Sequence, residues 1–147
     1  MAVLKYDIWI EASPDDVWAV YTDLDRIPEW QTGAPRVAEA NGSGDVVGTT
    51  YLVRRGPMTS RSTITAADAP AHHASHTQAV LGLTFDLVAD LTAADGGTRI
   101  ALEARTEWPR GLRLVGRAVE SALLSEREAV KELTNLKTLV EREAGRR

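Results

Sequence analysis

The sequence of 147 residues contains no cysteine. Disulfide bonds, thiolate chemistry and zinc sites with sulfur ligands are therefore excluded, and a reducing, cytoplasmic location is expected. No apolar run approaches the roughly 20 residues that a membrane-spanning helix needs, so we expect no integral membrane contact. The first residues also lack the charged-then-apolar order of a secretory signal peptide.

An excess of positive charge is missing too. Lysine and arginine together number 17, against 21 aspartates and glutamates, which gives a net charge of -4. A broad nucleic-acid-binding face is therefore not expected. The length and the 44% of hydrophobic residues fit one globular domain over residues 1–147.

Motifs for cofactors and metals are likewise absent from the sequence. It has no glycine-rich phosphate loop, no nucleophile elbow and no His-Glu-x-x-His zinc motif, and we expect no cofactor. Its histidines are His72, His73 and His76. Adjacent strand residues point to opposite faces, and His72 and His76 would lie about 13 Å apart, so no metal site is predicted.

The first elements can be read from alternation and capping signals. Residues 4–10 alternate between apolar and polar side chains, which predicts a half-buried strand. Trp9 falls on the polar phase and is expected to be exposed or covered by a loop. Ser13 is a good N-cap and Pro14 suits the first position of a short helix. Trp18 is then expected in the core, and a second short helix is expected over residues 23–29.

The rest of the chain predicts strands followed by one long helix. Turn signals such as Asp95-Gly96-Gly97 separate strands expected at 35–41, 48–55, 60–68, 72–80, 83–93 and 97–107. Short turns between consecutive strands indicate an antiparallel meander. From Gly111 to about Ala144, apolar residues at helical spacing predict one helix of roughly 33 residues. The expected fold is α+β: a curved antiparallel sheet of about seven strands, two short helices and a long C-terminal helix over a cavity.

Several short motifs carry a resemblance to a known superfamily. They are 12–18 (ASPDDVW), 22–25 (TDLD), 28–30 (PEW), 47–49 (VGT), 96–99 (GGTR) and 133–137 (LTNLK). With them the chain resembles the START/Bet v 1-like (SRPBCC) superfamily, and within it the bacterial polyketide cyclase/dehydrase-like proteins. The resemblance covers nearly the whole chain and implies the helix-grip fold. Members of the superfamily include lipid carriers, aromatase/cyclases, hormone receptors and chaperone activators, so the fold does not select one activity.

The resemblance implies a pocket between the concave face of the sheet and the long helix. The residues on the inward phase are then candidate ligand contacts, although the same periodicity also fits a solid core. These candidates are Trp30, Tyr51, Val53, Ile64, Phe85, Leu87, Leu102, Ala104, Thr106, Trp108, Val115, Ala118, Val119 and Ala122.

Glu126 is the candidate catalytic residue. A helical count from Leu112 places it at the centre of the apolar stripe, where an isolated carboxylate is costly unless it is paired, protonated or solvated. A pocket-facing Glu126 would have a raised pKa, which suits a general acid or base or a ligand anchor. Alternatively, Glu126 pairs with a strand arginine, or the helix lifts off the sheet there. Arg54 and Arg55 point to opposite faces, so at most one reaches the pocket, where it would bind an acidic ligand group or pair with Glu126.

Three functions are compatible with these observations. The first is binding of a hydrophobic small molecule (lipid-like, aromatic or polyketide-like), with Glu126, Tyr51 and one arginine or histidine as polar anchors. The second is a cyclase/dehydratase-type enzyme in which Glu126 moves protons while Tyr51 or Thr106 orients an oxygen. The third is a protein-interaction module that uses Trp9 or the loop after Gly56, which a solid interior would favour. The protein is expected to be a monomer, or a homodimer if an edge strand pairs with a second copy.

Overall fold

Seven antiparallel strands form one curved sheet in the computed structural model, which describes residues 2–109, 111–112 and 126–146. The strand order is β1-β7-β6-β5-β4-β3-β2, a meander that β1 joins at the far side of β7. The strands are β1 (Ala2–Ile10), β2 (Arg36–Ala38), β3 (Thr50–Arg55), β4 (Met58–Asp68), β5 (His72–Gln78), β6 (Thr84–Ala94) and β7 (Gly97–Glu107).

The hairpin between β6 and β7 forms at the predicted turn. Asp95 and Gly96 have φ values of 49° and 78°, and two consecutive positive φ angles are typical of the tight turn that matches the twist of a hairpin. Ala94 therefore pairs with Gly97, and the register continues to Thr84 opposite Glu107. The strand expected over 97–107 is confirmed.

Short helices connect β1 to β2. They are α1 (Pro14–Tyr21), the 3₁₀ turn η1 (Leu24–Arg26) and α2 (Ile27–Trp30). The hydroxyl oxygen of Ser13 accepts a hydrogen bond from the Asp16 backbone N–H at 3.2 Å, which confirms the predicted cap. A second 3₁₀ turn, η2 (Val80–Gly82), lies between β5 and β6, so β5 ends at Gln78 instead of continuing to residue 80.

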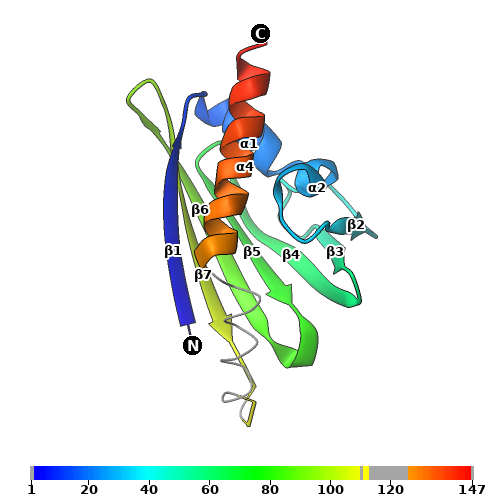
Figure 1. Cartoon of the computed structure of the whole chain (residues 1–147). Coiled ribbons are helices and arrows are strands. Elements are labelled where there is room, and N and C mark those ends of the chain that lie inside the picture. The colour runs from blue at the N-terminus through cyan, green and yellow to red at the C-terminus, as the bar shows by residue number, and fades with distance from the viewer. Residues whose placement is uncertain (1, 110, 113–125, 147) are drawn as a thin grey trace.

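Helix α4 (Glu126–Ala144) lies across the concave face of the sheet, with α1 and α2 beside it (Figure 1). Its described residues contact β1, α1 and α2. Leu133, Leu136, Leu139 and Val140 are its buried side chains. The preceding stretch 113–125 of the expected helix lies outside the described residues, and with it the candidates Val115, Ala118, Val119 and Ala122.

The main core lies where α1 and α4 meet the sheet. Ile10, Val17, Trp18, Ile100 and Leu136 belong to one buried cluster there, and Trp18 is in the core as predicted. The structure thereby confirms the α+β helix-grip architecture. Among the described residues, none of the helices has the length and apolar character needed to cross a membrane.

Trp9 differs from its expected position. Its side chain is half-buried, and its indole N–H donates to the Ala94 carbonyl at 2.8 Å. The Lys137 ammonium of α4 lies 5.1 Å from the centroid of a Trp9 ring and donates to the Trp9 carbonyl at 2.9 Å. Trp9 is therefore held by the β6–β7 hairpin and by Lys137 of α4 rather than fully exposed.

Candidate functional site

A cavity of about 640 Å³ lies between the concave face of the sheet, α4 and the segment that follows α2. Its apolar lining consists of Leu4, Ile27, Val53, Met58, Ala79, Val80, Leu83, Phe85, Leu87, Leu102, Ala104, Ala129 and Leu133. Its polar and amphipathic lining consists of Tyr6, Tyr21, Trp30, Gln31, Thr32, Tyr51, Arg55, Thr59, Ser60, Ser62, Ser75, Thr77, Glu128, Lys131 and Glu132.

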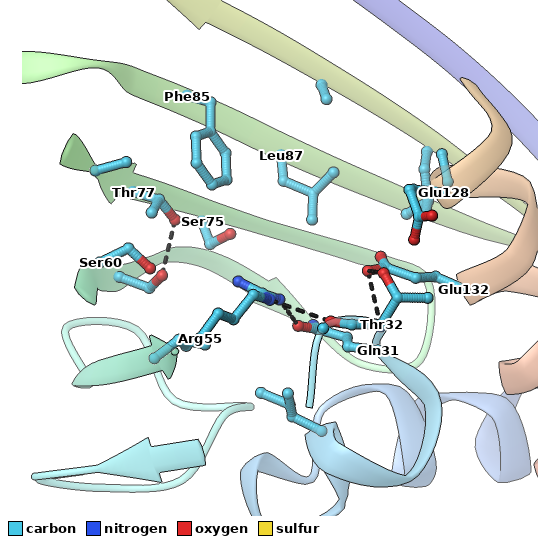
Figure 2. A pocket seen from close by; sticks show the side chains of 18 of the residues that line it. Gln31, Thr32, Arg55, Ser60, Ser75, Thr77, Phe85, Leu87, Glu128 and Glu132 are labelled. Atoms are coloured by element: carbon cyan, nitrogen blue, oxygen red, sulfur yellow. Dashed lines mark hydrogen bonds between the residues drawn. The ribbon is translucent and has the colours of Figure 1, made fainter. Parts of the chain in front are cut away.

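The two kinds of lining come from different strands. On β6 and β7 the inward positions are apolar, as at Phe85, Leu87 and Ala104, whereas β4 and β5 present mainly hydroxyl groups. Figure 2 shows Phe85 and Leu87 on one side of the space, and Ser60 and Thr77 toward the other. The cavity is therefore amphipathic, with an apolar wall on β6 and β7 and a polar wall on β3, β4 and β5.

Three hydroxyl groups form a row across the polar wall. Tyr51 on β3 lies opposite Ser62 on β4, and Ser62 lies opposite Thr77 on β5. The Ser62 and Thr77 oxygens are 2.7 Å apart, and Tyr51 is the cross-strand neighbour of Ser62. Burial raises the pKa of Tyr51 above 10.0, against the opposing effects of the Ser62 hydrogen bond and the Arg55 charge. The phenol is thus protonated at neutral pH and can donate a hydrogen bond.

Arg55, at the end of β3, points into the cavity. Its Nε donates to the Thr32 carbonyl at 3.3 Å, and a terminal nitrogen donates to the Gln31 side-chain oxygen. Both partners belong to the segment after α2, and Figure 2 shows the guanidinium held against this segment. Arg54, the preceding residue, is exposed on the opposite face. Arg55 is therefore the one of the two arginines that reaches the pocket.

Glu132 approaches the same segment from α4. One carboxylate oxygen accepts the Thr32 backbone N–H at 3.1 Å and the Thr32 hydroxyl at 3.0 Å. Burial raises the pKa of Glu132, and this effect outweighs the Thr32 hydrogen bonds and the Arg55 charge, both of which lower it. Thr32 thus lies between a cation on the sheet and a carboxylate on the helix, as Figure 2 shows.

A smaller pocket of about 40 Å³ adjoins the core and is lined in part by Tyr21, Ile64 and His73. The Nε2–H of His73 donates to the Gly44 carbonyl at 2.7 Å, while its Nδ1 is buried without a hydrogen-bond partner among the described residues. Burial lowers the pKa of His73 and raises that of Tyr21. Both side chains are therefore neutral at ordinary pH.

Of the ten predicted contact residues that the structure describes, seven line the main cavity. Trp30, Tyr51, Val53, Phe85, Leu87, Leu102 and Ala104 are among its lining residues. Ile64 lines only the smaller pocket. Thr106 and Trp108 are buried but are not among the lining residues of either pocket. The lining on β7 stops at Ala104, since Thr106 lies near the end of the strand and Trp108 lies beyond it.

The position predicted for Glu126 is wrong. Glu126 is the first residue of α4 in the described chain, and it is exposed and does not line either pocket. Of the alternatives for Glu126, pairing with a strand arginine is not seen among the described residues, and Glu126 and Arg127 are both exposed. The helix carboxylates that do line the cavity are Glu128 and Glu132.

Glu132, Gln31 and Thr32 are among the polar lining residues that the sequence analysis missed, as are hydroxyl residues of β4 and β5 such as Ser62 and Thr77. A signal for Glu132 existed, because it lies four residues before Leu136 and eight before Val140, both of which are buried. Residues four apart share one face of a helix, so this row extends directly to Glu132. Gln31 and Thr32 follow a helix of only four residues, and no periodicity extends to them.

Comparison with known proteins identifies the family. The family described as "Polyketide cyclase / dehydrase and lipid transport" matches residues 1–141. The chain belongs to this family. Among curated proteins, the search found no match to the chain.

Several solved structures share the fold. A Mesorhizobium loti protein has a TM-score of 0.74 at 15% identity, with 96% of this chain and 98% of that chain covered. The Aha1 dimer of Colwellia psychrerythraea has a TM-score of 0.68 at 18% identity, with coverages of 96% and 97%. DynU16, a protein in the dynemicin biosynthetic locus, has a TM-score of 0.70 at 16% identity, with coverages of 95% and 47%. At these identities the likeness establishes the fold alone.

Proposed function

We propose that the protein binds a hydrophobic small molecule, lipid-like, aromatic or polyketide-like, in the cavity between the sheet and α4. The observation that carries this proposal is the space of about 640 Å³ that this family member keeps open beside its core. Ligand pockets typically measure about 300–1,000 Å³ and combine apolar walls with a few polar groups. The apolar wall on β6 and β7 and the groups Tyr51, Arg55 and Glu132 fit that description.

Filling the cavity tests this proposal directly. Ala104 lines the space from β7, whereas Ala101 lies on the same strand and is exposed. We expect Ala104→Phe to occupy ligand volume and to weaken binding of a hydrophobic fluorescent probe at least about 10-fold, a change of about 1.4 kcal/mol. The dissociation constants of both variants would be measured by fluorescence titration.

Ala101→Phe is the matched control, because the same bulk is added outside the cavity. It should bind the probe as the wild type does. Equal binding by both variants would place the probe elsewhere and contradict the proposal. Native mass spectrometry would be applied to the wild type and to Ala104→Phe, both purified from the protein's own host. A mass that is bound to the wild type and missing from Ala104→Phe would identify the class of the ligand.

Acid–base catalysis of the cyclase/dehydratase kind is a second candidate, favoured by the raised pKa of Glu132 on the cavity wall. Dehydration of a β-hydroxy thioester requires a base to take the proton next to the carbonyl and an acid to protonate the departing hydroxyl. Glu132 and Tyr51 could divide these roles, in place of the Glu126 arrangement expected from sequence. If a substrate of this class is converted, Glu132→Gln should slow dehydration at least about 100-fold, and Glu126→Gln should not. Equal rates for the two variants would contradict this candidate.

The third expectation, a protein-interaction module without a ligand, gains no support. It was based on contacts through Trp9 or the loop after Gly56, and a solid interior would have favoured it; Gly56 and Pro57 are exposed, so a contact through that loop stays a prediction. The interior holds a cavity, and Trp9 is half-buried beneath Lys137.

A further inference from the structure

If the proposed function holds, the charged side chains that line the cavity indicate the chemical class of the ligand. We propose that the ligand is an amphiphile with a carboxylate group, that the Arg55 guanidinium binds this carboxylate, and that the apolar part of the ligand lies against the wall formed by β6 and β7.

Arg55 is a cation held in place by neutral partners. Gln31 and Thr32 use two of its five N–H donors, at Nε and at one terminal nitrogen. Arg55 forms no ion pair with a carboxylate of the described residues. A half-buried guanidinium that is already oriented and still has donors toward the cavity is a suitable partner for a carboxylate, which it can bind through two parallel hydrogen bonds.

The carboxylates of α4 do not occupy this position. Glu132 directs its carboxylate to the N–H and hydroxyl of Thr32, so the Thr32 residue separates it from the guanidinium. Glu128 lies one helical turn before Glu132, on the same side of the cavity, and Figure 2 shows both glutamates across the space from the stem of Arg55. On α4 the lining cation, Lys131, is exposed and is accompanied by Glu128 and Glu132, whereas Arg55 is half-buried, so an anionic ligand group is expected beside Arg55 at the β3 side of the cavity.

The row of hydroxyl groups supplies a further donor. Tyr51, Ser62 and Thr77 have three hydroxyl hydrogens, and the Ser62–Thr77 hydrogen bond uses one of them. Ser62 and Thr77 are only 5% and 4% exposed, and the Tyr51 phenol lies beside Ser62 on the cavity wall as a further donor. An acceptor from a ligand would satisfy this donor, and the Tyr51 phenol is close enough to Arg55 for the arginine charge to lower its pKa.

Pairs of probes that differ only in their head group measure the contribution of the carboxylate to the binding affinity. Dodecanoic acid and dodecanol share one chain, and naphthoic acid and naphthalenemethanol share one ring system. Binding of each probe at neutral pH would be measured by isothermal titration calorimetry with wild type, Arg55→Gln and Arg54→Gln. We expect the wild type to prefer one of the acids over its alcohol by about 10- to 100-fold, as a charged hydrogen-bonded pair provides. Arg55→Gln should abolish this preference, because it should lower the affinity for the acid far more than the affinity for the alcohol.

Each other outcome has a definite meaning. Arg54→Gln removes an equal charge from the exposed face and should keep the preference for the acid. Equal binding of acid and alcohol by the wild type would overturn the carboxylate inference but leave the container proposal intact. Loss of both probes in Arg55→Gln would assign Arg55 a structural role and also overturn the inference. Absence of binding for all four probes in the wild type would contradict the proposed function together with the inference.

Discussion

Thr32 connects the two charged sides of the cavity. Its carbonyl accepts a hydrogen bond from Arg55, while its N–H and hydroxyl donate to Glu132. The segment after α2 is therefore tied to both β3 and α4 through one residue. This arrangement holds Arg55 and Glu132 at fixed positions, which a binding site for a polar group requires.

Glu132 should make the stability of the protein depend on pH. Because its pKa is raised in the folded state, the native protein retains the Glu132 proton at pH values where the unfolded chain has lost it. The contribution of Glu132 to the free energy of unfolding is therefore fully present below the ordinary value of 4.5 and is lost as pH rises through the higher folded pKa. Relative to wild type, Glu132→Gln should gain stability over that rise, measured by urea unfolding at a series of pH values.

Glu126→Gln provides the control for this measurement. Glu126 lies on the same helix but is exposed, so its replacement should leave the pH dependence close to that of the wild type. A Glu132→Gln profile parallel to the wild-type profile across the whole range would show that Glu132 does not carry the shift.

The alternation of side chains along the strands predicted many of the residues that line the cavity. Counting positions along the helix predicted none of its described lining residues. Tyr51, Phe85, Leu87 and Ala104 line the cavity because side chains alternate strictly along a strand, so a phase set by neighbours persists. Glu126 was misplaced because its position was counted from Leu112 over fourteen residues, and its side chain is exposed in the structure. The sequence predicted that at most one of Arg54 and Arg55 reaches the pocket. Only the structure of β3 shows that this residue is Arg55.

At the scale of elements, the strands differ from expectation mainly at their ends. The strand expected over 35–41 is limited to β2 (Arg36–Ala38), because Glu39 adopts a positive φ of 53° that is incompatible with an extended strand. β5 stops before the turn η2, where Leu81 has a φ of 58°. Neither residue is a glycine, so the composition gave no signal for either left-handed conformation.

Helix α4 is attached by its buried face. Leu136 is fully buried within the core cluster, whereas Val130 on the same helix is 50% exposed. Leu136→Ala should lower the free energy of unfolding by about 2–5 kcal/mol, because it removes apolar contacts and leaves a cavity. Thermal and urea unfolding monitored by circular dichroism would measure the change.

Val130→Ala is the corresponding control on the exposed side of α4. Its effect should stay within about 0.5 kcal/mol. If the two substitutions had equal effects, α4 would not pack on the sheet through the Leu136 face.

For the whole molecule, the fold was predictable and the contents of the cavity were not. The meander followed from short turns between alternating segments, and the helix-grip arrangement followed from the resemblance to the superfamily. Pairing of β1 with β7 joins residues from distant parts of the chain, such as Ala2 with Thr106, and no local pattern specifies it. The ligand class depends on which inward side chains meet across the cavity, and this requires the register of every strand.

The order of the elements along the chain also has a consequence for the synthesis of the protein. The polar and apolar walls belong to β3 through β7, but α4, which covers them, follows all seven strands along the chain. While the protein emerges from the ribosome, the concave face is therefore open until the helix arrives. A compound that adheres to the nascent sheet could be enclosed as the helix docks, and the finished protein could then carry its first occupant from the moment of its production.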